Sequence, residues 1–235
     1  MKPVYSETMI DFHTHILPGV DDGSKNLDES LQLLQMEQQQ GIDIVVLTPH
    51  YYSSQNSPEV FFRRRYQAWR LLCESWQRGM PRLLLGAEVE FFEGITALAN
   101  LQDFCIQRTS LLLLEMPFCS RSERIIRIVE ELNGTGGIQI VLAHVERYLS
   151  FQGNAQALKR LRQGGILMQI NASFFEGWLS KRKALSMLDK GMVQFLGSDC
   201  HNLSNRKPNW ELVPKAVMQS MEASGKRLLG QYMYR

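Results

Sequence analysis

Short apolar runs alternate with longer amphipathic segments along this chain. The runs are rich in Ile, Val and Leu and are apolar at consecutive positions, which is typical of strands covered on both faces of a parallel sheet. Seven such runs predict strands, at residues 9–13, 42–48, 82–90, 111–116, 138–144, 166–171 and 193–199.

The segments between the runs have the pattern of helices. Asn26 and Pro58 are start signals, and glycines follow most of the expected helix ends. The 93–110 link is less regular, with a short helix expected around residues 94–100. The predicted helices lie near 27–40, 58–78, 121–133, 154–163, 178–190 and 210–224.

This alternation predicts an α/β fold, either a closed barrel or an open doubly wound sheet. An open dinucleotide-binding sheet would carry GxGxxG after its first strand, where this chain has "HTHILPGVDDG", so the barrel is favoured. No Pro-, Gly- or Ser-rich linker divides the 235 residues. We expect a short N-terminal extension (residues 1–8) and one barrel domain (residues 9–235).

Composition narrows the class of protein. A net charge of +2 is too weak to indicate nucleic-acid binding, and no apolar stretch approaches the roughly 18 residues of a membrane span. The start lacks the apolar segment of a signal peptide, and the four cysteines form no CxxC pair. A reduced, cytoplasmic protein is expected. The basic run "RRRYQAWR" (63–70) is interpreted as a solvated helix face.

Every predicted strand ends in a polar residue, and these strand ends include all five histidines of the chain. In a parallel barrel the carboxyl ends of the strands meet at one face, where active sites lie. Glu115 and His144 follow apolar runs, where an unpaired polar group would be costly to bury. The strand-end residues are His13, His15, His50, Glu88, Glu115, His144, Asn171, Asp199 and His201.

Imidazoles and carboxylates together predict a metal centre. His13 and His15 are two residues apart on a strand, so both rings reach one face. Carboxylates mixed with imidazoles suit Mn²⁺, Fe²⁺ or Zn²⁺, and the lack of cysteine ligands disfavours a structural zinc site. With Asp22 added, nine candidate ligands exceed what one ion binds, which indicates two or three ions.

Clustered divalent ions indicate hydrolysis of a phosphate ester. Arg147 and Arg206 follow two of the candidate ligands and could hold the phosphoryl group. Aromatic residues crowd the same loops, and as a set they suit an aryl group in the substrate. Of these, Tyr51 and Phe118 are the predicted substrate contacts.

The motifs, in chain order, resemble the polymerase-and-histidinol-phosphatase (PHP) superfamily, in particular its capsule-biosynthesis tyrosine-protein phosphatases. They are HxH, DDG, TPH, GAE, a strand ending LLEMPF, AHxER, SDxHN and a following Arg, between about residues 9 and 210. Histidinol-phosphatase relatives tend to have histidine where this chain has Asp22 and Glu115. That difference favours the tyrosine-phosphatase branch.

The resemblance implies a distorted TIM-like (β/α)7 barrel with a trinuclear centre, Mn²⁺ being the expected ion and Fe, Zn, Co and Mg the alternatives. Arg147 and Arg206 would hold the phosphate, and His201 is a candidate proton donor as well as a ligand. The implied substrate is the tyrosine-rich tail of a bacterial tyrosine kinase that controls polysaccharide export. The implied ion sites are His13, His15, Glu88 and Asp199; Glu88, Glu115 and His144; and Asp22, His50 and His201.

Several alternatives stay open. A small-molecule phosphatase of the same superfamily would share the site. Cys200 and Arg206 have the C-x5-R spacing of cysteine-dependent phosphatases, but the loop between them has no glycine. An amidohydrolase-like enzyme would need a histidine where Asn171 stands, and a barrel holding metal only for structure would not need the arginines. The sequence assigns no role to Asp21 and leaves the oligomeric state open.

Overall fold

The computed structural model describes residues 8–120 and 122–221. The predicted N-terminal extension, apart from residue 8, and the last residues of the chain lie outside this description. The strands all pair in parallel, in the orders β1-β2-β4 and β3-β5-β6-β7-β8-β9. They are β1 (Ile10–Thr14), β2 (Ile44–Leu47), β3 (His50–Tyr51), β4 (Arg82–Leu85), β5 (Glu88–Glu90), β6 (Leu111–Glu115), β7 (Gln139–Leu142), β8 (Leu167–Asn171) and β9 (Phe195–Gly197).

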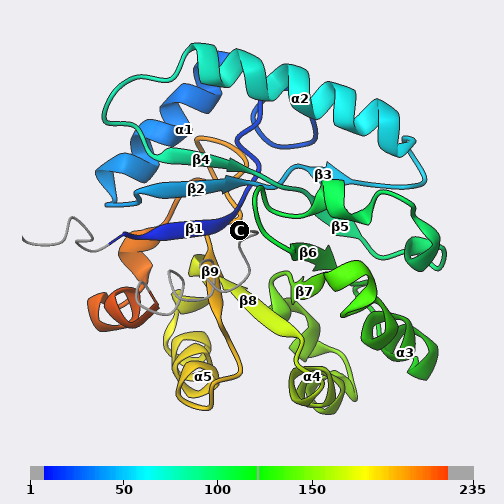
Figure 1. Cartoon of the computed structure of the whole chain (residues 1–235). Helices are drawn as coiled ribbons and strands as arrows, with labels where there is room; N and C mark the ends of the chain where they lie inside the picture. The colour runs from blue at the N-terminus through cyan, green and yellow to red at the C-terminus, as the bar shows by residue number, and fades with distance from the viewer. Residues whose placement is uncertain (1–7, 121, 222–235) are drawn as a thin grey trace, which may run out of the picture.

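The two groups of strands form one curled parallel sheet (Figure 1). β3 follows β2 and β5 follows β4 after breaks of two residues. The third predicted run (82–90) therefore contributes to both groups, whereas the second (42–48) contains only β2, and β3 begins beyond it at His50. At the other seam, the Asp199 amide donates to the His13 carbonyl at 2.8 Å, and the His15 amide donates to the Cys200 carbonyl at 2.9 Å. The first and last strands therefore lie side by side at their carboxyl ends.

Helices α1 to α5 line the outside of the curled sheet (Figure 1). The side chains of Asn26, Ser57 and Ser122 cap α1, α2 and α3 by accepting from backbone amides of the first turns. The predicted helix around 94–100 is replaced by two short 3-10 turns. The helices are α1 (Leu27–Gln39), α2 (Pro58–Glu74), α3 (Glu123–Leu132), α4 (Asn154–Gln163) and α5 (Trp178–Asp189).

The strands are apolar on both faces because each face meets a separate core. Leu111 and Leu113 of β6 belong to a cluster built mainly from alternate strand residues, on the concave side of the sheet. Leu112 and Leu114 belong to the larger cluster that includes residues of the helices. This arrangement explains the continuous apolar runs, since a sheet with one wet face would alternate.

A buried arginine supports the break between β4 and β5. Arg65 of α2 is 8% exposed and donates to the Gly86 carbonyl at 2.9 Å and to the Asp103 carbonyl at 2.8 Å. The prediction that the basic run 63–70 is wholly solvated is therefore wrong for this residue. Beyond the break, His50 and Glu88 pair in register, which brings two predicted ligands together at the carboxyl edge.

Candidate metal centre

The two histidines of the first strand point into a shared, closed site. His13 and His15 are fully buried, and their Nε2 atoms lie 3.0 Å apart. Two glycines make room for them. A Cβ on Gly197 would lie 2.5 Å from the His13 Cβ, and a Cβ on Gly23 would lie 2.1 Å from the His15 carbonyl oxygen. The sequence around each histidine is thus adapted to a tightly packed centre.

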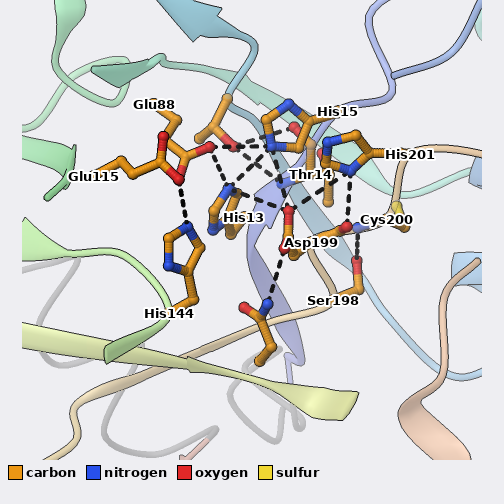
Figure 2. A network of polar contacts seen from close by, with 12 residues as sticks. His13, Thr14, His15, Glu88, Glu115, His144, Ser198, Asp199, Cys200 and His201 are labelled. Atoms are coloured by element: carbon orange, nitrogen blue, oxygen red, sulfur yellow. Dashed lines mark hydrogen bonds and ion pairs between the residues drawn. The ribbon is translucent and has the colours of Figure 1, made fainter. Parts of the chain in front are cut away.

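Glu88 faces several histidines, and Figure 2 shows its contacts with His13, His15 and His144. Its Oε2 is 3.0 Å from His13 Nε2, 3.3 Å from His15 Nε2 and 3.1 Å from His50 Nδ1. This oxygen is buried and has no hydrogen-bond partner. A carboxylate oxygen facing three imidazole nitrogens without a hydrogen bond is a donor set suited to a divalent cation.

The other carboxylate oxygen of Glu88 extends the site toward β6 and β7. Glu88 Oε1 lies 2.9 Å from His144 Nε2, and Glu115 Oε1 lies 3.3 Å from the same nitrogen. His144 has a φ of 29°, which is uncommon for a residue with a side chain. Both oxygens of Glu88 thus face predicted ligands, as a bridging carboxylate requires.

A further group forms around Asp22 at the exposed side of the centre. Asp22 Oδ1 is 3.5 Å from His201 Nε2 and 3.8 Å from His50 Nε2. His201 is 1% exposed and its Nε2 has no hydrogen-bond partner. The group has ligand atoms within 4.8 Å of one another and also includes His15.

Asp199 joins the ligands to the two predicted phosphate-binding arginines. Its Oδ1 lies 3.7 Å from His13 Nε2 and 3.5 Å from His15 Nε2. Arg206 Nη2 donates to Oδ1 at 2.9 Å, and Arg147 donates to Oδ2. Asp199 has a φ of 54°, so a left-handed turn aims this carboxylate into the site.

The electrostatics of the centre favour bound cations. Burial alone would raise the pKa of Glu88, but the charges of His13 and His50 outweigh it and hold that pKa well below its ordinary value. The pKa of Asp199 is likewise held low against burial, chiefly by His13 and His15. Burial opposes the charged form of His144, yet hydrogen bonds to Glu115 and Glu88 raise its pKa to about 9. The ionised carboxylates thus attract positive charge, which metal ions can supply in place of protons.

The residues present therefore fit a centre of more than one metal ion. In the part of the chain that the structure describes, three groups of side chains have the geometry to hold an ion. All nine predicted ligands come together at one edge of the sheet (Figure 2 shows seven of them). The groups are His13, His15 and Glu88; His50, Glu88 and Glu115; and His15, Asp22, His50 and His201.

Asp21, to which the sequence assigned no role, orients two of the ligands. Its Oδ2 lies 2.6 Å from His15 Nδ1 and accepts from the His50 amide at 2.8 Å. Oδ1 accepts from the Gly23 amide at 3.0 Å. A carboxylate on the far nitrogen of a ligating histidine fixes the ring and its tautomer. The adjacent Asp-Asp pair could have suggested such a division of roles.

The sequence also missed an amide pair on β8. Gln169 Oε1 accepts from the His144 amide at 2.7 Å and lies 3.2 Å from His13 Nδ1. Its Nε2 donates to Asn171 Oδ1 at 2.8 Å, and Asn171 Nδ2 donates to Asp199 Oδ2 at 2.9 Å. Both side chains are buried. β8, which supplies none of the nine predicted ligands, thus contacts predicted ligands of β1 and of the segments that follow β7 and β9.

The two predicted substrate contacts differ in position. Tyr51 is 2% exposed and packs against Phe61 and Phe104 in the core, so its assignment to substrate binding is wrong. Tyr52 points to the site instead, with its ring stacked on His50 at a centroid distance of 4.8 Å. Phe118 is 47% exposed and stacks on His144 at 5.6 Å.

Cys200 is unsuited to act as a nucleophile. Its side chain is fully buried, with Sγ 3.7 Å from Glu37 Oε1. Burial, together with the charges of Glu37 and Asp11, raises the pKa of the thiol well above its ordinary value. The geometry therefore disfavours the cysteine-dependent phosphatase.

Comparisons with known proteins agree with the character of the site. The family model described as capsular polysaccharide synthesis, CpsB/CapC, matches residues 9–229. A putative tyrosine-protein phosphatase CapC of Staphylococcus aureus is 30% identical over 84% of this chain and 79% of its own. Tyrosine-protein phosphatase CpsB of Streptococcus agalactiae NEM316 is 29% identical over 85% and 86%, and YwqE of Bacillus subtilis is 29% identical over 84% and 79%.

A solved structure also resembles this chain over nearly its whole length. It comes from work on YwqE of Bacillus subtilis and CpsB of Streptococcus pneumoniae, described as unique metal-dependent tyrosine phosphatases. The TM-score is 0.79 with 22% identity, over 96% of both chains. This likeness shows a common fold. Among the described residues, no helix is long and apolar enough to span a membrane.

Proposed function

The chain belongs to the CpsB/CapC family of capsular polysaccharide synthesis, and from this premise we propose that it is a metal-dependent protein-tyrosine phosphatase. The observation that carries the proposal is Glu88, whose two oxygens face four imidazoles at 2.9–3.3 Å while one of them has no hydrogen bond. Such a centre, with two arginines beside it, has the chemistry of a phosphomonoesterase.

The chain's own residues would bind and orient the phosphoryl group. Divalent ions held by the nine ligands would withdraw charge from the phosphoryl oxygens and supply a nucleophile at neutral pH. Arg147 and Arg206 both contact Asp199, so their guanidinium groups lie at the edge of the ligand set where they can donate to phosphate oxygens. His13, His15, Glu88 and Asp199 would hold the first ion.

Departure of a phenolate needs little help from a proton donor. A tyrosine phenol has a pKa near 10, far below that of a serine alcohol. His201 Nδ1 lies 2.9 Å from the Asp199 carbonyl oxygen, to which it can donate a hydrogen bond. In this tautomer Nε2 carries no proton, and its lone pair is free to bind an ion on the side of Asp22. We therefore propose His201 as a ligand of the Asp22–His50 group and not as the proton donor.

We also propose that the curled sheet is a distorted barrel of seven β/α units forming a single domain. The two seams support this description. β2 and β4 continue into β3 and β5, and a parallel bridge joins Thr14 at the end of β1 to Cys200 beyond β9. The carboxyl ends of the strands then converge on the metal centre, as in other α/β barrels.

The proposed substrate is a phosphotyrosine protein in the capsule pathway, namely a bacterial tyrosine kinase with phosphorylated tyrosines in its tail. The relatives are named tyrosine-protein phosphatases and the family is described by capsular polysaccharide synthesis. The proposed ion is Mn²⁺ and the proposed location is the cytoplasm. A divalent ion with mixed imidazole and carboxylate ligands is consistent with Mn²⁺.

The test is hydrolysis of p-nitrophenyl phosphate and a phosphotyrosine peptide after chelation and after return of Mn²⁺, Fe²⁺, Co²⁺ or Zn²⁺. We expect turnover to disappear with chelation and to return with at least one ion. No recovery with any of the four ions would refute the phosphatase proposal.

Replacement of Cys200 separates this mechanism from the cysteine-dependent one. Cys200→Ser should retain activity within about threefold, since the thiol is buried and un-ionised. Loss of turnover in this variant, with full activity of the wild type in chelator, would instead support the cysteine mechanism.

A further inference from the structure

A cavity of about 490 Å³ lies beside the metal centre. Its lining includes two predicted ligands, Asp22 and His50, together with Tyr52. Its volume lies within the range of small-ligand sites, which is roughly 300–1,000 Å³. A group bound at the ligands therefore has space to extend from them into this cavity.

Tyr52 is the aromatic residue that lines the cavity next to the predicted ligand His50. Its ring stacks on His50 with a centroid distance of 4.8 Å and an interplanar angle of 25°. Tyr51, the preceding residue and the last of β3, packs in the core. Because the Tyr52 ring stacks on His50 and both residues line the cavity, Tyr52 lies on the side of the predicted ligands.

The position of Arg206 indicates where the organic part of a phosphate ester would lie. Arg206 Nη1 is 3.9 Å from Asp22 Oδ2, and Asp22 also lines the cavity. A phosphoryl group held between Arg206 and the Asp22–His50–His201 group would thus lie at the mouth of the cavity. Its ester oxygen can then direct the leaving group past Tyr52.

Polar residues surround the same space. Arg64 of α2 lines the cavity and donates to the carbonyls of Gly19 and Val20, both at 3.2 Å, in the segment that carries Asp22. Gln55 and Asn56 also line the cavity, and their backbone N–H groups donate to the Tyr52 carbonyl at 3.0 and 3.2 Å. These amide side chains can bond to a peptide backbone on either side of the substrate tyrosine.

Phe118 is the rival position for an aromatic contact. It stacks on His144, near β7, and is not among the residues that line this cavity. Its ring is 47% exposed, whereas Tyr52 is half-buried. A ring bound against Phe118 would have less apolar surface covered than one enclosed in the cavity.

We propose that this cavity is the leaving-group subsite and that Tyr52 is its specificity-determining residue, receiving the phenyl ring of phosphotyrosine. The subsite selects aryl phosphates over alkyl phosphates because an aromatic ring stacks on Tyr52 and fills the space, whereas a short alkyl group does neither. The proposal deepens the phosphatase function and rests on it.

The test measures binding of two unreactive analogues, phenylphosphonate and methylphosphonate, to the Mn²⁺-loaded protein by calorimetry. Tyr52→Leu should weaken phenylphosphonate about tenfold and leave methylphosphonate nearly unchanged, since aromatic pairs contribute modestly. Tyr52→Phe should retain the wild-type ratio. Tyr66→Leu, at an exposed tyrosine of α2, is the matched control and should change neither constant.

Two outcomes would overturn the subsite. Equal weakening of both analogues in Tyr52→Leu would mean that Tyr52 acts on the metal centre through His50. If Phe118→Leu, and not Tyr52→Leu, selectively weakened the binding of phenylphosphonate, the phenyl ring of the ligand would lie against Phe118 and not in this cavity. If the wild type hydrolyses no aryl phosphate with any ion, the proposed function fails, whatever the binding ratio.

Discussion

Two pairs of buried carboxylates, one of which includes Asp11 of β1, differ in their neighbours. Glu88 and Asp199 face the imidazoles of the metal centre and the two arginines. Asp11 and Glu37 face each other, with the Ser198 hydroxyl 3.4 Å from Glu37 Oε1 and the Trp210 indole N–H donating to Glu37 Oε2 at 2.9 Å. Glu37 and Glu88 are both fully buried.

The neighbours decide whether the pKa of each buried carboxyl lies above or below its ordinary value. Desolvation raises the pKa of any buried carboxyl, and for Glu37 the nearby Asp11 raises it further, well above its ordinary value. For Glu88 the surrounding histidines overcome desolvation and lower the pKa. Burial of a carboxylate therefore does not identify a metal ligand. The chemistry of its partners does.

The largest contrast is expected between Glu88→Gln and its matched control Glu37→Gln. Loss of the Glu88 charge should lower metal affinity and phosphatase activity by more than about 100-fold. The expected loss exceeds the roughly 10–100-fold that is typical when a residue that only hydrogen-bonds to a ligand is changed. Glu37→Gln should change both by less than about threefold. Metal content by mass spectrometry and p-nitrophenyl phosphate kinetics measure the difference. Equal losses would show that the two carboxylates are not functionally distinct.

An intermediate effect is expected for Asp21→Asn, which keeps the shape but removes the charge beside His15 Nδ1. Burial opposes ionisation of Asp21, but the charge of His15 outweighs it, so the pKa of Asp21 lies below its ordinary value. We expect metal affinity about 10–100-fold weaker, measured by competition with a chelator. Asp43→Asn, at an exposed residue whose carboxylate accepts from the Met9 amide, is the control. Unchanged affinity in Asp21→Asn would contradict an orienting role.

The smallest effect concerns the pH dependence of stability. Because the pKa of folded Glu37 lies above its value in the unfolded chain, the folded state binds the proton more tightly. Its contribution is full below the unfolded pKa and is lost as the pH rises through the folded pKa. Glu37→Gln cannot ionise, so it should gain stability relative to the wild type between pH 5 and pH 8.

Urea denaturation of the metal-free proteins at the two pH values measures this difference. The comparison between variants removes the titration of groups that they share. A free-energy difference between wild type and Glu37→Gln that is the same at pH 5 and pH 8 would mean that folding does not raise the pKa of Glu37.

The periodic pattern was sufficient to predict where helices and strands occur, but not where a strand is interrupted. Helices α1 to α5 begin within two residues of their predicted starts, and side-chain caps mark the starts of α1, α2 and α3 locally. The last predicted helix, near 210–224, begins instead at residue 215, after a 3-10 turn. The run 82–90 divides into β4 and β5, which belong to different groups, and β3 begins at His50, beyond the end of the run 42–48. At the break within 82–90 the Gly86 carbonyl accepts from Arg65 of α2, a contact that no local pattern reports.

The sequence by itself determined the types of the candidate ligands, their order and their places at strand ends, because a parallel sheet brings the carboxyl ends of its strands to one edge. Tertiary structure decided which partners each side chain meets. It placed Tyr51 in the core and Tyr52 at the site. It brought the Asp21 carboxylate into contact with the His15 ring, and it placed Glu37 beside Asp11 but Glu88 among histidines. The pKa values of two buried glutamates are thus shifted in opposite directions, because those shifts depend on neighbours distant in the chain.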